Sequence, residues 1–525
     1  MKLLRPSLPD PIIIFFGGLF CFTMGLQHTE IIGFESRFYL FALEMWRHGP
    51  SWFPTTYRTP YADYPGTSTF LIYLTAHLMG GMSKLAAVLP SAIAASITLS
   101  ITYLIGALHT RSLGWYAAGF LLFTLAFLME ARTISLDMFI TTVTACTFYV
   151  VYSAKLRQQH VPVLLIILLL ICGFMIRGPL GLVIPTSLLC VFYLLYGESK
   201  HVLLVAFIGL GLLLICTSLL LFIAYDTAGQ HFMQEVLRMQ VFGRLQENRT
   251  PPWYFYFVEN IGAYAITYPL CIFILLGIFL QLCQRKLSPD LKFLQILLGW
   301  ILIILTGLSM AADKKIRYVL SIAPPLALFC SYLLITSHPS TYFIWLRKLF
   351  YFICGLFPLI GLAVLALLYH HQIDLNYVVL TISFIMLQSV ILLLRNRHAT
   401  FLLALITFVF SYIAIVEPIN FNTNKTAQFV QNIENLRKIN RAQLIFYREG
   451  PDGLAIKYLA DMPQEDDPIF ITDINAALKK AFIITSTENV SSLPLNSLHI
   501  IAHGKIGHDA VIVFSKTAPH PQAAF

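Results

Sequence analysis

The sequence predicts an all-α polytopic membrane protein with a small α/β domain at its C-terminal end. Of the 525 residues, 58% are apolar and only 12% are charged, whereas soluble domains average about 25% charged residues. The mean hydropathy is +0.74, and apolar runs of about 20 residues, enough to cross a hydrocarbon core of about 30 Å, recur along the chain. Because backbone groups in lipid must be satisfied within their own segment, we expect these runs to be helices.

Thirteen apolar segments are expected to cross the membrane. The first follows a basic start that lacks a small-residue cleavage site, so we expect it to remain as a span. A shorter segment, 67–81, follows Pro65 and Gly66 and is expected to be an interfacial or re-entrant helix. The expected spans are residues 11–27, 84–108, 114–129, 138–154, 162–176, 179–196, 202–225, 259–282, 292–311, 317–336, 348–369, 376–394 and 399–418.

The basic residues alternate between loops in a way that predicts the topology. One set of loops is short and mostly basic, as cytoplasmic loops tend to be: residues 109–112, 155–160, 197–201, 284–292, 337–348 and 395–398. The other loops and the C-terminal region are then external, and counting 67–81 as a crossing would spoil the alternation. The net charge of +9 therefore indicates topology, and we expect no nucleic-acid partner.

From about Asn420 the composition becomes that of an ordinary soluble protein. We expect a transmembrane domain over 1–418 and an external domain over 419–525. Residues 426–439 have the apolar spacing of an amphipathic helix, and 477–481 suggest a helical piece. Short apolar runs predict strands at 442–449, 468–473, 481–487, 498–504 and 510–516.

The nine cysteines lie in the apolar part of the chain, and none lies in the C-terminal region. This placement excludes a disulfide framework and a cysteine-based metal site. Histidine-rich and HExxH patterns, which are typical of zinc enzymes, are also missing from the sequence. We therefore expect chemistry that needs neither a metal nor another cofactor.

The stretch 27–66, between the first apolar run and the 67–81 helix, is polar and rich in Trp, Tyr and Pro. Loops longer than about 12–15 residues usually carry function or are disordered, and this one is too aromatic for disorder. We expect it to form one wall of an external active site. It contains four carboxylates and three arginines: Glu30, Glu35, Glu44, Asp63, Arg37, Arg47 and Arg58.

The other expected external loops also collect polar residues. Carboxylates there could take a proton from an acceptor hydroxyl, and Arg and Lys could hold a phosphate and stabilise it as a leaving group. Alternatively, such residues only solvate loops or reach lipid head groups, and Asp137 in Ser-Leu-Asp would ordinarily be a helix cap. The residues concerned are Arg132, Asp137, Arg177, Arg244, Glu247, Asn248, Arg249, Trp253, Tyr254, Asp313, Lys314, Lys315, Arg317 and Tyr318.

Five stretches, in chain order, resemble motifs of the bacterial aminoarabinose transferases of lipid A and the related protein O-mannosyltransferases. Residues 33–76 resemble that family's first external loop, which reads D-E-x-R-Y, then W-x-x-P, then P-Y-x-x-K-P-P-L. The others are EARTISLDMF, IRGPLGLVIP, FGRLQENRTPPWYFY and KIRYVLSIAPPLALF. Together the five cover about residues 10–335.

The resemblance implies a GT-C fold and a glycosyltransferase. Such an enzyme takes a sugar from a polyprenyl-phosphate donor to lipid A, a protein or a glycan at the periplasmic face of the bacterial inner membrane. On the matched positions it implies that Glu35 and Asp137 are the carboxylates at the acceptor and the donor. It implies donor binding by Arg58, Arg177, Arg249, Lys315 and Tyr318, with support from Arg37, Asp63, Tyr64, Trp253 and Tyr254.

The chain departs from the family pattern at three positions. Phe34 stands where the first Asp of the D-E pair is usual, Tyr64 where Lys is usual, and Asn248 where His is usual. Glu35 or Glu30 would then take over the role of the missing Asp, and Arg58 or Arg177 would replace the missing cation. These departures favour a divergent branch with an unusual sugar or acceptor.

Two other functions compete with sugar transfer. A transporter or lipid flippase would often show internal repeats and charges near the membrane midplane, whereas this chain has no repeat and its charges gather in loops. An inactive scaffold of the same fold is suggested by the missing Asp and Lys. Release of free polyprenyl phosphate from a labelled donor would separate the enzyme from both.

Overall fold

A computed structural model describes most of the chain, which divides into two compact units. The first unit comprises residues 1–24, 63–65 and 88–416, and the second comprises residues 25–62, 66–87 and 417–525. The expected domain boundary near residue 418 stays a prediction. The described residues are 9–26, 34–63, 65–242, 251–283, 291–312, 314–336, 340–370, 397–417, 425–450, 468–473, 481–493, 498–506 and 509–515.

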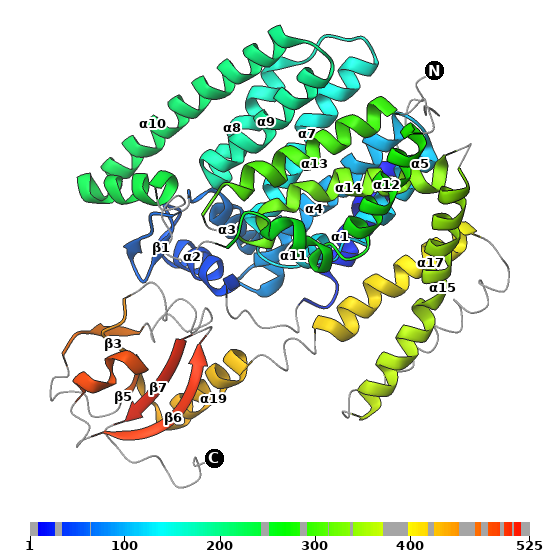
Figure 1. Cartoon of the computed structure of the whole chain (residues 1–525). Coiled ribbons are helices and arrows are strands. Elements are labelled where there is room, and N and C mark those ends of the chain that lie inside the picture. The colour runs from blue at the N-terminus through cyan, green and yellow to red at the C-terminus, as the bar shows by residue number, and fades with distance from the viewer. Residues whose placement is uncertain are drawn as a thin grey trace. The chain divides into compact units, whose positions relative to one another are not determined.

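Helices are the only regular secondary structure among the described residues of the first unit (Figure 1). Its elements are α1 (Pro9–Thr23), α4 (Lys84–Ala107, whose first turn belongs to the second unit), α5 (Arg111–Leu122), α6 (Leu125–Ala131), α7 (Leu136–Leu156), α8 (Val163–Arg177), α9 (Pro179–Leu195), α10 (Ser199–Leu237), the π-helix η2 (Arg238–Phe242), α11 (Phe255–Ala263), α12 (Thr267–Cys283), α13 (Leu291–Ser309), the 3₁₀ helix η3 (Ile316–Ile322), α14 (Ala323–Ile335), α15 (Thr341–His370), α17 (Arg397–Ser411) and the π-helix η4 (Tyr412–Val416).

Within the described residues, five helices are long and apolar enough to cross a membrane. The pairs α5–α6, bent by 74°, and α11–α12, bent by 114°, raise this number to seven if each pair is one span. Each expected span among the described residues falls on a helix or a helix pair, and the expected span 376–394 lies outside them. The prediction of a polytopic helical membrane protein is confirmed, while the number of thirteen crossings stays a prediction.

An aromatic core holds α7 against α9 and α13. Trp300 of α13 is fully buried, and its ring lies 4.7 Å from that of Phe148 on α7. Phe192 of α9 packs edge-on against Phe148 at 6.0 Å. Large aromatic side chains bury much area and prefer such tilted contacts, so they fix the axis of α7, whose first turn enters the candidate active site.

Two glycines let α8 and α9 touch backbone to backbone. A Cβ on Gly173 would overlap the carbonyl of Gly181, and one on Gly181 would overlap the carbonyl of Gly173. Small residues allow this close approach between membrane helices. The tight α8–α9 pair also packs on α7, so the turn between α8 and α9 is held next to the start of α7.

The second unit combines segments from both ends of the chain. Its N-terminal part contains α2 (Phe34–His48), the paired strands β1 (Thr55–Thr56) and β2 (Thr59–Pro60), and α3 (Thr67–Met79). Helix α3 has 13 residues, too few to cross the hydrocarbon core at about 1.5 Å per residue. The interfacial or re-entrant placement expected for 67–81 stays a prediction.

The C-terminal part of this unit is a five-stranded mixed sheet with strand order β4-β3-β5-β7-β6. Strand β3 pairs in parallel with β4 and β5, whereas β7 is antiparallel to β5 and β6. The amphipathic helix and five strands expected here are confirmed, and 477–480 of the expected helical piece lie outside the described residues. The elements are α19 (Lys425–Asn440), β3 (Gln443–Tyr447), β4 (Ile469–Ile471), β5 (Ala481–Ser486), β6 (His499–Ile506) and β7 (Asp509–Ser515).

Candidate active site

The candidate active site is built around Asp137, in the first turn of α7. Ser135 is the N-cap residue of this helix, and its hydroxyl accepts a hydrogen bond from the Met138 N–H at 3.3 Å. The Ser-Leu-Asp cap expected from the sequence is therefore provided by Ser135, because a capping side chain satisfies an orphan N–H. The Asp137 carboxylate is left for other partners, although its residue is only 6% exposed.

Two arginines hold this carboxylate, one at each oxygen. Arg177 Nη1 donates a hydrogen bond to Asp137 Oδ1, and Arg317 Nε lies 3.5 Å from Oδ2. The Arg177 side chain is 5% exposed, whereas that of Arg317 is 20% exposed. Burial of a charge is tolerated when the charge is paired in this way. The more accessible Arg317 therefore lies on the side from which a ligand could approach.

A third cation, Lys315, joins the cluster through the aromatic ring of Tyr318. Its ring centroid lies 4.7 Å from Arg177 Cζ, 5.6 Å from Arg317 Cζ and 5.7 Å from Lys315 Nζ. A cation within about 6 Å of an aromatic face is attracted by the ring quadrupole. The tyrosine thus keeps three like charges together at one place, where an anionic ligand would find them.

The 3₁₀ helix η3 places Arg317 and Tyr318 against α7. The Thr141 and Ser321 hydroxyls lie 3.3 Å apart and join the two elements, and Tyr264 Oη donates to the Ile316 carbonyl at 3.4 Å. Just before η3, Lys314 Nζ donates to the Pro251 carbonyl at 2.9 Å. The segment that carries the cations is therefore anchored on both sides.

Gly178 forms the turn that places Arg177. The residue has φ +62° and ψ −146°, a region that is essentially restricted to glycine. A Cβ at this position would lie 2.5 Å from Gln240 Oε1. Gln240 in turn donates from Nε2 to the Asp63 carbonyl. The turn between α8 and α9 therefore lies against Gln240 of η2, and Gln240 links it to Asp63 at the end of the first polar loop.

A second carboxylate, Glu130, lies beside this cluster and was not among the expected site residues. It stands near the end of α6 and accepts a hydrogen bond from the Ser135 hydroxyl. It interacts electrostatically with Asp137, Arg177 and Arg317. The only sequence signal was its position seven residues before Asp137, in the same polar turn.

Arg132, which the sequence marks as a polar candidate, has a structural role instead. Its guanidinium is 1% exposed and donates to the Cys21 carbonyl at 2.7 Å and the Met24 carbonyl at 2.9 Å. The last carbonyls of a helix lack partners within that helix. Arg132 thus supplies hydrogen-bond donors to backbone carbonyls at the C-terminal end of α1.

The structure brings four of the expected site residues together, namely Asp137, Arg177, Lys315 and Tyr318. Trp253 and Tyr254 lie at the start of α11 and are 71% and 49% exposed. Asp63 contributes its carbonyl to Gln240. Arg249 and Tyr64 lie outside the described residues.

The remaining expected residues belong to the second unit. Glu35 is in the first turn of α2, and its side chain is outside what the structure describes. Arg37 lies over the Tyr61 ring at 5.4 Å. Arg58 is exposed with φ +68°, and its N–H donates to Glu44 Oε2 at 2.9 Å. Glu44, which is 1% exposed, thus supports the β1–β2 turn.

No group of three His, Cys, Asp or Glu side chains that could hold a metal ion occurs among the described residues. The expectation of chemistry without a metal stays a prediction. What the cluster offers chemically is two carboxylates beside three cations. This is a combination suited to a ligand that carries a phosphate.

Comparisons with known proteins agree with the family that the motifs resemble. Residues 63–225 match the family model described as dolichyl-phosphate-mannose-protein mannosyltransferase. The search of curated proteins found no match. The structure of ArnT from Cupriavidus metallidurans bound to undecaprenyl phosphate is similar at a TM-score of 0.68 and 13% identity, covering 99% of this chain and 100% of that one.

The apo structure of ArnT from Cupriavidus metallidurans gives a TM-score of 0.67 at 13% identity, with 98% of each chain covered. At this identity the likeness establishes the fold, which is the ArnT-like GT-C fold. The resemblance stated from the motifs is confirmed by the family model and the fold. The family model bears on residues 63–225, and the solved structures bear on the fold of the whole chain.

Proposed function

We propose that this chain transfers a sugar from a polyprenyl-phosphate donor to a hydroxyl or phosphate acceptor at the periplasmic face of the inner membrane. The observation that carries the proposal is the Asp137 carboxylate held between Arg177 and Arg317 beside the Tyr318 ring. The solved ArnT structure bound to undecaprenyl phosphate supports the choice of donor. The acceptor is lipid A, a protein or a glycan.

In the donor half of the reaction, the bond between the anomeric carbon and the phosphate oxygen breaks. The electron pair stays with that oxygen, and polyprenyl phosphate leaves with an additional negative charge. Arg177, Arg317 and Lys315 are positioned to stabilise this charge, because cations aimed at a developing anion lower the barrier. A guanidinium has five N–H donors, so it can hold a carboxylate and a phosphate together.

In the acceptor half, an acceptor oxygen attacks the anomeric carbon, and its proton passes to a carboxylate. Asp137 is engaged by two guanidiniums, so we assign it to the donor side, where it orients the cations. Glu35 is assigned as the proton acceptor, with Glu30 as the alternative that the departure at Phe34 leaves open. Arg58, Arg249, Trp253 and Tyr254 are assigned to the donor or its surroundings on the motif resemblance.

The test uses the full chain in membranes supplied with a labelled polyprenyl-phosphate sugar. We expect release of free polyprenyl phosphate and label in one of three fractions: lipid A, protein or glycan. Asp137→Asn should abolish both signals. The matched control is Asp10→Asn, because Asp10 is also a buried carboxylate paired with an arginine, Arg111 at 2.6 Å. Movement of the donor across the bilayer without release would instead identify a transporter.

The proposed side of the membrane can be tested in the same strain. Ser491 in the C-terminal region and Gln159 in a basic loop are both exposed. A membrane-impermeant thiol reagent applied from the periplasm should label Ser491→Cys and spare Gln159→Cys. The reverse pattern would contradict the proposed topology while leaving the transfer reaction untouched.

A further inference from the structure

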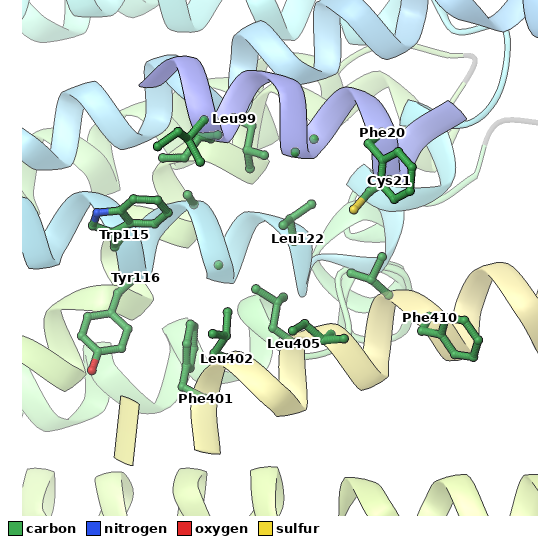
Figure 2. A pocket seen from close by; sticks show the side chains of 18 of the residues that line it. Phe20, Cys21, Leu99, Trp115, Tyr116, Leu122, Phe401, Leu402, Leu405 and Phe410 are labelled. Atoms are coloured by element: carbon green, nitrogen blue, oxygen red, sulfur yellow. The ribbon is translucent and has the colours of Figure 1, made fainter. Parts of the chain in front are cut away.

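An apolar pocket with a volume of about 770 Å³ lies between α1, α5 and α17 (Figure 2). Figure 2 shows Phe20, Leu122, Leu405 and Phe410 facing one another across it. Its lining is almost wholly apolar, apart from a polar end near Tyr116 and His398. Because hydrocarbon chains surround membrane helices, the natural occupant of such a pocket is an aliphatic chain.

The pocket is long enough to span one leaflet of the hydrocarbon core. Its lining on α17 and η4 runs from His398 to Ile413, which is about 22 Å at the rise of a helix. Half of a hydrocarbon core of about 30 Å is about 15 Å. One acyl chain that enters at the polar end would therefore reach the bilayer midplane inside the pocket.

The polar end is positively charged. Helices α1, α5 and α17 all begin there, at Pro9, Arg111 and Arg397, and the N-terminal end of a helix favours an anion. The acidic residue at this end, Asp10, is 2% exposed and is neutralised by Arg111. Arg397 and His398 are exposed at the start of α17. The end therefore complements a negatively charged head group.

Aromatic side chains also lie at the polar end of the pocket. Trp115 is 41% exposed and lines the pocket beside Tyr116, whose hydroxyl lies 2.6 Å from His398 Nδ1. Trp and Tyr are enriched where the hydrocarbon core meets the head groups. The polar end is therefore at the depth at which a phospholipid carries its phosphate.

This end lies far from the candidate active site. His109, two residues before Arg111, is 2.8 Å from the Tyr152 hydroxyl near the C-terminal end of α7. Asp137 is in the first turn of the same helix, about 22 Å from Tyr152 along the helix axis. A donor whose phosphate lay at Arg111 and His398 could not place its sugar at Asp137.

We propose that this pocket binds one acyl chain of an anionic phospholipid, with its head group at the N-terminal ends of α1, α5 and α17. The basic loop at 109–112 and the basic residues Arg397 and His398 border this end, so the lipid belongs to the leaflet that they face. Attraction of an anionic lipid is worth about 1 kcal/mol for each nearby basic residue, or about fivefold in affinity. The site is independent of the proposed sugar transfer.

The test reconstitutes the full chain in phosphatidylcholine vesicles that contain increasing amounts of phosphatidylglycerol with brominated acyl chains, which quench tryptophan fluorescence on contact. Subtracting the quenching of Trp115→Phe isolates the signal of Trp115. We expect it to saturate at about fivefold lower lipid fraction with brominated phosphatidylglycerol than with brominated phosphatidylcholine. Arg397→Gln should remove most of this preference.

A pocket-filling variant shows whether the bound chain lies in the pocket. Gly17 lines it, and a Cβ there meets nothing within 4 Å, so Gly17→Leu should fill the space without strain and abolish the preference. Gly211 on α10 also has open space around it, and Gly211→Leu should change nothing. Equal quenching by both lipids, an unaffected Gly17→Leu, or displacement of the brominated lipid by polyprenyl phosphate would overturn the proposal.

Discussion

Arg177 donates a hydrogen bond to Asp137 across 40 positions of sequence. The pair forms because α7 begins just before Asp137, α8 ends at Arg177, and the two helices pack together. The end of one helix therefore meets the start of the other. Arg317 reaches the same carboxylate from η3, so three segments far apart in the chain build one charged cluster.

Asp137→Asn should lower the rate of donor turnover by about 100-fold or more, since loss of a positioned electrostatic group typically costs about that much. Removing one partner of a buried ion pair also costs about 3–5 kcal/mol of stability. Asp10→Asn also removes a buried carboxylate from an arginine without touching the cluster. Turnover per folded molecule and Tm should be measured for both, and equal losses of turnover would refute a specific role for Asp137.

Arg317→Gln should lower kcat/KM for the donor by about 10- to 150-fold. A hydrogen bond to a charged group is worth about 1.5–3 kcal/mol, and the Asp137 carboxylate that remains is still paired with Arg177. Tm should therefore change by only a few degrees. Arg317→Lys keeps a point charge but loses the planar fork. Its kcat/KM should lie between those of the wild type and Arg317→Gln. Wild-type kinetics in Arg317→Gln would remove this residue from the site.

Gly178→Ala should lower the free energy of unfolding by about 1–3 kcal/mol, because a residue held in a glycine-only conformation is strained by that amount. It should also reduce turnover, since the turn places Arg177. Gly211→Ala is the matched control, with open space around its Cβ. The double variant Gly178→Ala with Gln240→Ala removes the clash at 2.5 Å but keeps the backbone strain, so we expect partial recovery of Tm.

Arg132→Gln should destabilise the protein by about 3 kcal/mol or more, since it withdraws buried donors from the carbonyls of α1. Turnover per folded molecule should stay near that of the wild type. Thermal unfolding followed by size-exclusion chromatography checks the first expectation, and an assay of the folded fraction checks the second. A selective loss of turnover at unchanged Tm would show that Arg132 takes part in the reaction.

Glu35→Gln should abolish sugar transfer without changing Tm, if this residue takes the acceptor proton. Glu30→Gln is the informative partner, because the departure at Phe34 leaves either carboxylate able to take the role. Transfer should be lost in Glu35→Gln and kept in Glu30→Gln, and the reverse result would assign the role to Glu30. Full activity in both would show that the proton is accepted elsewhere, and Glu130→Gln would then be the next variant to assay.

Much of the architecture could be predicted because its signals are local. The apolar run at 84–108 is a helix over Lys84–Ala107, and the short apolar run at 442–449 contains strand β3. The bends were not predictable in this way. The expected single span 114–129 is broken between Leu122 and Leu125, where the Thr124 hydroxyl bonds with the Phe120 carbonyl and with Thr267 on α12. That partner comes from a distant helix.

The sequence by itself determined the membrane class, the order of the helices and strands, and the identity of Asp137, Arg177, Lys315 and Tyr318 as candidates. These follow from hydropathy, periodicity and short motifs, all of which are read over neighbouring residues. Only the tertiary structure decided that Arg317 and Glu130 join the cluster and that Arg132 supports α1. The physical reason is that a side chain's role depends on which backbone and charged groups surround it. Those groups come from helices that are adjacent in space and distant in the chain.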